Sequence, residues 1–181
     1  MEHVTKLFSV LALCMVVMAH QTAAAEFNKG KDLINNLCNL SPTKDLCIQV
    51  LSSDETSSTA DLRDLAVIAL RVAASNASSI LTDAKMLIDD VKLNPKVQQG
   101  LADCKENILD AVDQLEDTTA ALLEDDNSQA QKWLKAALAA ITTCDASIPG
   151  DDDVLSVKSA SFRKLCNIAI FLTKSLPSSH S

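Results

Sequence analysis

The stretch "PKVQQGLADCKENILDAVDQLEDTTAALLE", residues 95–124, repeats an apolar or small side chain at alternating steps of four and three. This spacing keeps the repeated positions on one side of an α-helix for almost four heptads. Pro95 suits the first turn of such a helix, where its missing N–H costs nothing. The sequence therefore predicts a long amphipathic helix with a buried seam of Val97, Leu101, Cys104, Ile108, Ala111, Leu115, Thr118 and Leu122.

Three further segments show a comparable periodicity on either side of this one. Residues 58–93 form a predicted helix with Ser58 or Thr59 as its cap, and Asn94-Pro95 ends it. Residues 127–144 and 153–176 form two more, and the aspartates at 151–153 precede the last one, where the helix dipole favours negative charge. The expected buried positions are Leu62, Leu65, Ala69, Val72, Ile80, Leu87 and Val91 in the first, Ala130, Trp133, Ala137, Ala140 and Cys144 in the second, and Ser161, Leu165, Ile168 and Leu172 in the third.

The predicted helices are joined by short links at Asn94-Pro95, at 125–127 and at about 146–151. Short links make consecutive helices run antiparallel. The chain has only three Gly, four Pro and no Tyr, a composition that argues against β-sheets. We therefore expect an all-α protein, an antiparallel up-down-up-down four-helix bundle over residues 58–176, preceded by a helical hairpin over 26–55.

The N-terminus has the pattern of a secretory signal peptide. Lys6 precedes an apolar run at 7–19, and three alanines at 23–25 provide a cleavage site after Ala25. The run is too short to cross ~30 Å of hydrocarbon, and we expect no later stretch to be long and apolar enough to span a membrane. The prediction is a signal peptide at 1–25 and a soluble, secreted mature domain at 26–181.

Five cysteines remain after residue 25, and an oxidising compartment favours their pairing as disulfides. Cys104 and Cys144 lie symmetrically about residue 124, where the second and third bundle helices should turn. Antiparallel partners at equal distance from a turn sit side by side, and both cysteines fall on buried seams. The sequence therefore predicts a Cys104–Cys144 disulfide.

Cys38 and Cys47 then pair locally across the turn at Ser41-Pro42, between short helices expected at 27–37 and 43–52. Zinc would need further Cys or His ligands, and redox pairs have two intervening residues instead of eight. The disulfide would stabilise helices that are marginal alone. Cys166 stays unpaired, and two interpretations remain open: a buried inert thiol, or a thiol that links two chains.

Other functional classes find little support in the composition. The only His after residue 25 is His180, so a Ser-His-Asp or Cys-His hydrolase is not expected. We expect no metal and no cofactor. A net charge of −8 and an isoelectric point near 4.7 argue against binding to nucleic acid or to a membrane surface. Asn76, in "NAS", is a candidate glycosylation site, whereas Asn39 is a poorer one because Pro42 follows its sequon.

The ordered set of these features resembles the plant invertase and pectin methylesterase inhibitors over essentially the whole mature sequence. The resemblance rests on the signal peptide, the C-x8-C hairpin, "TADLRDLAVIAL", "LADCKENILDAVDQL", "WLKAALAAITTC" and "KLCNIAIFL". It implies a four-helix bundle with a helical hairpin and the same two disulfides. It also implies an inhibitor, and not an enzyme, which binds a secreted or vacuolar carbohydrate-active enzyme of plants and occludes its substrate cleft.

The sequence departs from the family pattern at several positions. Ile108 stands where many members have Tyr, Lys135 where many have Ser, and Ile148 where Phe is common. Invertase-directed members often carry Pro-Lys-Phe before the fourth cysteine, and the corresponding region here reads "DDNSQAQKW". The resemblance therefore favours a pectin methylesterase as the partner, with acid invertase as the alternative and a non-inhibitory secreted helical module as a third possibility.

The partner surface is expected on the polar faces of the second and third bundle helices. Gln131, Lys132 and Lys135 are the residues proposed for it. An acidic surface would attract a basic enzyme and accelerate encounter in a salt-dependent way. The expected protein is a monomer outside the cell, in the apoplast or cell wall, with the vacuole as the less favoured location.

Overall fold

The computed structural model describes residues 29–150 and 155–177. The predicted signal peptide and the aspartates at 151–153 lie outside the described residues. The helices within the described ranges are α2 (Gly30–Cys38), α3 (Lys44–Leu51), the 3-10 helix η1 (Glu55–Ser58), α4 (Leu62–Ile88), α5 (Pro95–Leu123), α6 (Asn127–Ser147) and α7 (Ser156–Ser175).

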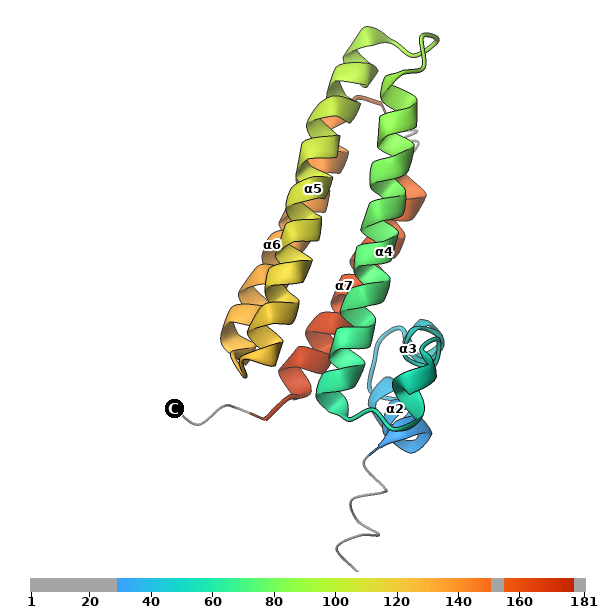
Figure 1. The fold of residues 1–181 in the computed structure, drawn as a ribbon. Coiled ribbons are helices and arrows are strands. Elements are labelled where there is room, and N and C mark those ends of the chain that lie inside the picture. Colours follow the sequence, from blue (N-terminus) through green and yellow to red (C-terminus); the bar gives the residue numbers. More distant parts are fainter. Residues whose placement is uncertain (1–28, 151–154, 178–181) are drawn as a thin grey trace, which may run out of the picture.

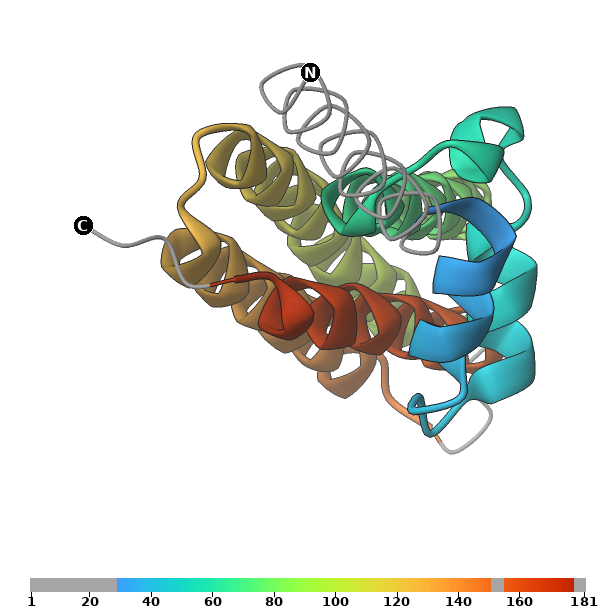
Figure 2. The same ribbon diagram turned by 90° about the horizontal axis from the view of Figure 1, so that it is seen from below.

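Helices α4 to α7 form an elongated bundle in which successive helices run in opposite directions (Figure 1). Seen along its axis, the order around the bundle is α4, α5, α6, α7, and α7 closes the ring against α4 (Figure 2). The hairpin α2–α3 lies beside the end of the bundle where α4 begins. The predicted all-α, up-down-up-down bundle with an N-terminal helical hairpin is confirmed.

The predicted seam of α5 is the buried side of that helix. Leu101, Cys104, Ile108 and Leu115 are at most 1% exposed, and Ala111, Thr118 and Leu122 are fully buried. Only Val97, at the open end of the helix, is half-buried. The heptad pattern was therefore sufficient to orient this helix in the bundle.

In the other helices one predicted core position, Val91, is wrong, and five are only half-buried: Leu62, Val72, Leu87, Trp133 and Ser161. Val91 is 92% exposed because α4 ends at Ile88, three residues earlier. Ser161 and Trp133 are only half-buried, whereas their neighbours Phe162 and Leu134 are completely buried. In α6 and α7 the buried side is wider than a two-position seam, since each helix contacts two neighbours.

The start of α4 is set by aspartates rather than by Ser58 or Thr59, which the sequence had suggested. Asp61 Oδ1 accepts from the backbone N–H groups of Arg63 (2.9 Å) and Asp64 (3.0 Å). Asp64 Oδ2 accepts from the N–H of Asp61 at 3.1 Å, which completes a capping box. Ser58 instead ends η1, so the hydroxyl residues before Asp61 belong to a separate turn.

Pro95 occupies the first turn of α5 as predicted, and Asn94 caps the helix by accepting from Lys96 N at 2.9 Å. The link from α4 is longer than the expected Asn94-Pro95, because it covers residues 89–94. The side-chain amide of Gln98 donates to the backbone carbonyls of Ile88 and Asp90, each at 3.0 Å, and so provides hydrogen-bond partners for this turn.

Helices α5 and α6 approach closely at Gly100. A Cβ atom at this position would lie 2.3 Å from the carbonyl oxygen of Ser147 and 3.0 Å from the Cα of Ile148. Both contacts are to backbone, which cannot swing aside as a side chain can. The glycine therefore lets the start of α5 lie directly against the end of α6.

Polar contacts hold the bundle together near its ends. Arg63 of α4 pairs with Asp125 and donates to the carbonyl of Leu122, which fixes the α5–α6 turn against α4. Arg163 of α7 pairs with Asp145 of α6. The core between these ends is mainly apolar and rich in alanine, and Thr118, Ser159 and Thr173 are buried within it.

Helix α4 has the length and apolarity of a membrane span. One 18-residue window has a mean hydropathy of 1.5, so the expectation that no later stretch would qualify is wrong by this criterion. The reason is the run of Ala, Leu and Ile with which α4 contacts the other helices. Since 44% of that window is buried inside the bundle, and core helices of soluble proteins pass the same test, this is weak evidence for a membrane span.

Candidate functional site

The residues proposed for partner binding lie on α6, and they differ in exposure. Lys132 and Lys135 are exposed, and Lys132 Nζ is 3.4 Å from Gln129 Oε1. Gln131 is half-buried. One helical turn before it, Asn127 donates to the carbonyl of Pro177 at 2.8 Å, so the start of α6 lies beside the end of α7.

The neighbouring helix α5 presents a continuous acidic row to solvent. Its carboxylates recur at steps of three and four on the side opposite the buried seam, and all are exposed: Asp103, Glu106, Asp110, Asp113 and Asp117. We use the name α5–α6 face for these five carboxylates of α5 and the exposed Lys132 and Lys135 of α6. The sequence-based prediction named Gln131, Lys132 and Lys135 for the partner surface and did not include this row.

A disulfide between Cys104 and Cys144 lies under the α5–α6 face. The two Cα atoms are 3.9 Å apart and both residues are fully buried. A second disulfide joins Cys38 to Cys47, with Cα atoms 5.5 Å apart, and links α2 to α3. The α5–α6 face is thus carried by two helices that are cross-linked near one end and closely packed at Gly100.

Cys166 of α7 is a free cysteine that is buried in the core of the bundle. Its side chain has no exposed surface, and burial raises the pKa of its thiol to about 12. Since the thiolate is the reactive form, this position suits an inert thiol and not a link between two folded chains. The interpretation of Cys166 as a buried, unreactive residue is the one that its surroundings support.

We expect the native protein, produced as residues 26–181, to resist alkylation by a maleimide at pH 8. With a pKa of about 12, roughly one Cys166 thiol in ten thousand is ionised at that pH, and burial blocks access as well. Mass spectrometry should show no adduct on the native protein and one adduct after unfolding without reductant. Labelling of the native protein at the rate of an exposed thiol would contradict this assignment.

The same thiol gives a second readout. Between about pH 9 and 12 the unfolded chain releases the Cys166 proton while the native state keeps it. The free energy of unfolding should therefore fall as pH rises through this window, and it should fall less steeply in Cys166→Ala.

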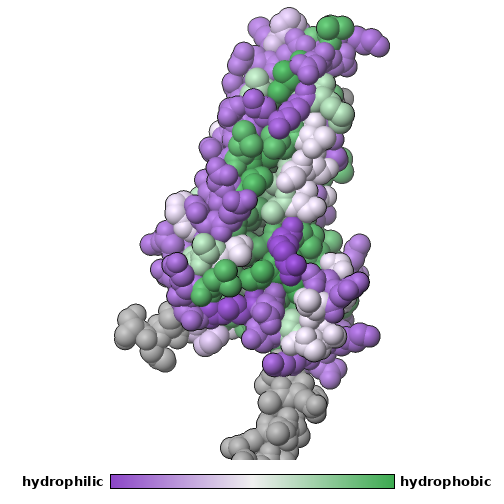
Figure 3. Space-filling view, viewed as in Figure 1, coloured by the Kyte–Doolittle hydropathy of each residue, from purple (hydrophilic) through white to green (hydrophobic). Residues whose placement is uncertain are grey.

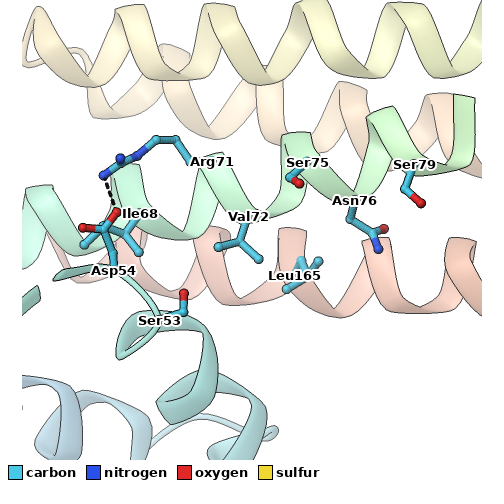
Figure 4. A pocket seen from close by; sticks show the side chains of 9 residues that line it. All are labelled: Ser53, Asp54, Ile68, Arg71, Val72, Ser75, Asn76, Ser79 and Leu165. Atoms are coloured by element: carbon cyan, nitrogen blue, oxygen red, sulfur yellow. Dashed lines mark ion pairs between the residues drawn. The ribbon is translucent and has the colours of Figure 1, made fainter. Parts of the chain in front are cut away.

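A cavity of about 460 Å³ opens between α4, α7 and the segment before η1 (Figure 4). Arg71 and Asp54 pair across one end at 3.1 Å. The pKa of Asp54 is lowered mainly because the Thr56 hydroxyl and N–H donate to it, with a smaller contribution from Arg71. Asn76 projects from α4 into this cavity with its buried Oδ1 unpaired. Glycosylation of Asn76 stays a prediction, and a glycan there would have to leave through the cavity.

The side of the bundle formed by α4 and α5 differs from the charged α5–α6 face. Half-buried apolar residues of α4 follow each other at heptad steps: Val67, Ala74, Leu81 and Ile88. On α5, Leu109 is 37% exposed and Val112 is half-buried. Apolar surface accordingly appears along the line between the two helices (Figure 3).

The chemistry of the described residues offers binding surfaces more than reactive centres. Among residues 29–150 and 155–177, no group of three or more His, Cys, Asp or Glu side chains is arranged to hold a metal ion. These ranges also contain no histidine, since His3, His20 and His180 lie outside them.

Comparison with known proteins identifies the family. The model of the plant invertase/pectin methylesterase inhibitor family matches residues 32–172. Pectinesterase inhibitor 3 of Arabidopsis thaliana is 29% identical, with 81% of this chain and 78% of that protein covered. The pectinesterase inhibitor of Actinidia deliciosa is 25% identical over 97% of this chain and 96% of its own length. A Platanus acerifolia protein named "Putative invertase inhibitor" is 27% identical, with 73% of this chain and 75% of that protein covered.

Solved structures agree with the fold. The crystal structure of a mutant form of a pectin methylesterase inhibitor from Arabidopsis superposes with a TM-score of 0.69 at 22% identity, covering 81% of this chain and 98% of that one. The chain therefore belongs to the plant invertase/pectin methylesterase inhibitor family, whose members are enzyme inhibitors and not catalysts.

Proposed function

We propose that this protein inhibits a pectin methylesterase by placing its α5–α6 face over the substrate cleft of the enzyme. The observation that carries the proposal is the family membership, combined with the pectinesterase inhibitors that match it over most of their length. The absence of Pro-Lys-Phe from residues 125–133 also favours this target. Acid invertase is the second candidate, favoured by the similarity to the Platanus acerifolia protein.

The physical basis of inhibition would be a rigid, convex surface. The two helices of the α5–α6 face are held by a disulfide and by backbone contact at Gly100, so little conformational freedom would be lost on binding. The acidic row of α5 would attract an enzyme with a basic rim and would raise the association rate at low salt. Lys132 and Lys135 would then contact the cleft directly. We place this encounter outside the cell and expect one inhibitor monomer per enzyme.

The first experiment is a titration of the mature domain into a pectin methylesterase and into an acid invertase at mildly acid pH. We expect stoichiometric loss of the esterase activity and no change in the invertase. Loss of the invertase activity alone would favour the second candidate. No effect on several isoforms of either enzyme would favour a non-inhibitory helical module.

Reversing both charges in Lys132→Glu/Lys135→Glu should weaken inhibition of the esterase about tenfold or more, because two contacts would become repulsive. The matched control is Lys92→Glu/Lys96→Glu, which makes the same change in net charge on exposed residues at the α4–α5 turn. Any long-range electrostatic effect is shared by the two variants, so the difference in inhibition constant reports on local contact. Equal inhibition by both variants would mean that Lys132 and Lys135 are not at the interface.

A further inference from the structure

A groove separates the tip of the hairpin from α7. It has a volume of about 360 Å³, and the turn between α2 and α3 forms one wall with Ser41, Pro42 and Thr43. Figure 2 shows the hairpin beside α7 at this end of the bundle. The groove is remote in sequence from Lys132 and Lys135, and neither residue lines it.

The α7 wall combines cationic, amide and aromatic side chains on one side of the helix. Lys164, Asn167, Phe171 and Lys174 follow each other at steps of three, four and three, and all of them line the groove. The two lysines are exposed and lie about 15 Å apart along the helix axis, at 1.5 Å per residue. Half-buried Phe171 and Ile170 form an apolar floor between them.

The two lysines differ from the other cations of α7. Lys158 pairs with Asp83 and Arg163 pairs with Asp145. Lys164 and Lys174 have no ion pair or hydrogen bond within the described part of the chain. No Asp or Glu is among the described residues that line the groove. In a protein with a net charge of −8, this groove therefore presents uncompensated positive charge.

We infer that this groove binds an acidic polysaccharide, specifically a run of de-esterified uronic acid units such as the product of a pectin methylesterase. A sugar acid offers the features that the groove complements. Its ring has an apolar face that can lie on Phe171, its carboxylates can pair with Lys164 and Lys174, and its hydroxyls can bond to Asn167 and to the hydroxyls at the hairpin tip. The spacing of the lysines suits an oligosaccharide better than a single sugar.

This inference rests on the proposed function in one respect, because the proposed target enzyme would produce the de-esterified ligand. An inhibitor that also held de-esterified pectin would be concentrated where its target enzyme has already acted. The groove is built from the hairpin and α7, and it shares no lining residue with the α5–α6 face.

The test is direct binding of the mature domain to a hexameric oligogalacturonide, measured by calorimetry at low salt. We expect binding that weakens as salt is added, and no binding to the fully methyl-esterified oligomer. Lys164→Gln/Lys174→Gln should weaken binding about tenfold, whereas the control Lys92→Gln/Lys96→Gln should bind like the parent. Phe171→Leu, which keeps an apolar side chain, should also weaken binding.

Several outcomes would overturn the inference. These are no binding of the parent protein, equal losses in both lysine variants, or equal affinity for poly-glutamate, which would indicate attraction of any polyanion. Esterase inhibition measured on the same samples separates the two proposals. Oligogalacturonide binding without esterase inhibition would contradict the proposed function and support the groove as a binding site. Esterase inhibition without oligogalacturonide binding would support the proposed function and contradict the binding site.

Discussion

Replacing Cys104 and Cys144 together by alanine is expected to lower the free energy of unfolding by about 4 kcal/mol. The disulfide closes a loop with a sequence separation of 40 residues, and the loop-entropy model assigns this amount to the lost constraint on the unfolded chain. For a domain of this size the melting temperature should fall by roughly 8–16 °C. Urea unfolding and calorimetry under non-reducing conditions measure both quantities.

The matched control is removal of the other disulfide in Cys38→Ala/Cys47→Ala. That loop has a separation of only nine residues, and the same model assigns it about 2.7 kcal/mol. All four cysteines are fully buried, so the burial of the replaced side chains is comparable. A larger loss from the Cys38–Cys47 variant would mean that the hairpin, and not the bundle, limits stability. Peptide mapping of the unreduced protein should find Cys104 joined to Cys144.

The surroundings of Cys104 show which parts of the fold can be predicted from the spacing of residues within a helix. The α5 seam and the position of Cys104 on it follow from spacings within a single helix, which sequence alone contains. The symmetry of Cys104 and Cys144 about the α5–α6 turn then fixes which helices are neighbours. The pairing of α5 with α6 could be predicted because the two helices are antiparallel and joined by a short link.

Other features depended on competition between equally plausible local choices. Ser58, Thr59 and Asp61 are all good caps, and the outcome was decided by Asp64, which completes the capping box with Asp61. At Gly100 the backbone of α6 leaves no room for a side chain, and the pattern of a single helix does not contain this contact.

The candidate surfaces were the least predictable part. Lys158 and Lys164 are both lysines of α7, yet one faces Asp83 of α4 and the other faces the hairpin groove. Gln131 was grouped with Lys132 and Lys135 by sequence, although its side chain is half-buried and theirs are exposed. Which polar residues remain free is set by side chains from distant parts of the sequence, and a single helix pattern does not contain that information.

The second large effect on stability is expected from a residue on the buried side of α7. Replacing Phe162 by alanine should lower the free energy of unfolding by about 3–5 kcal/mol, since it is one of the largest fully buried side chains and its loss leaves a cavity in the core. Ser161→Ala, one position away on a half-buried side chain, should change stability by less than about 0.5 kcal/mol. Urea unfolding of both variants measures the contrast.

A third variant separates burial from aromatic character. Phe171 lies on the same helix but is half-buried at the hairpin groove, so Phe171→Ala should cost clearly less than Phe162→Ala. The original sequence pattern placed Ser161, and not Phe162, on the buried side. A larger loss from Ser161→Ala than from Phe162→Ala would restore that register, and with it would rotate Lys164 and Lys174 away from the groove. The stability of Phe162→Ala therefore also bears on the orientation of the proposed polysaccharide site.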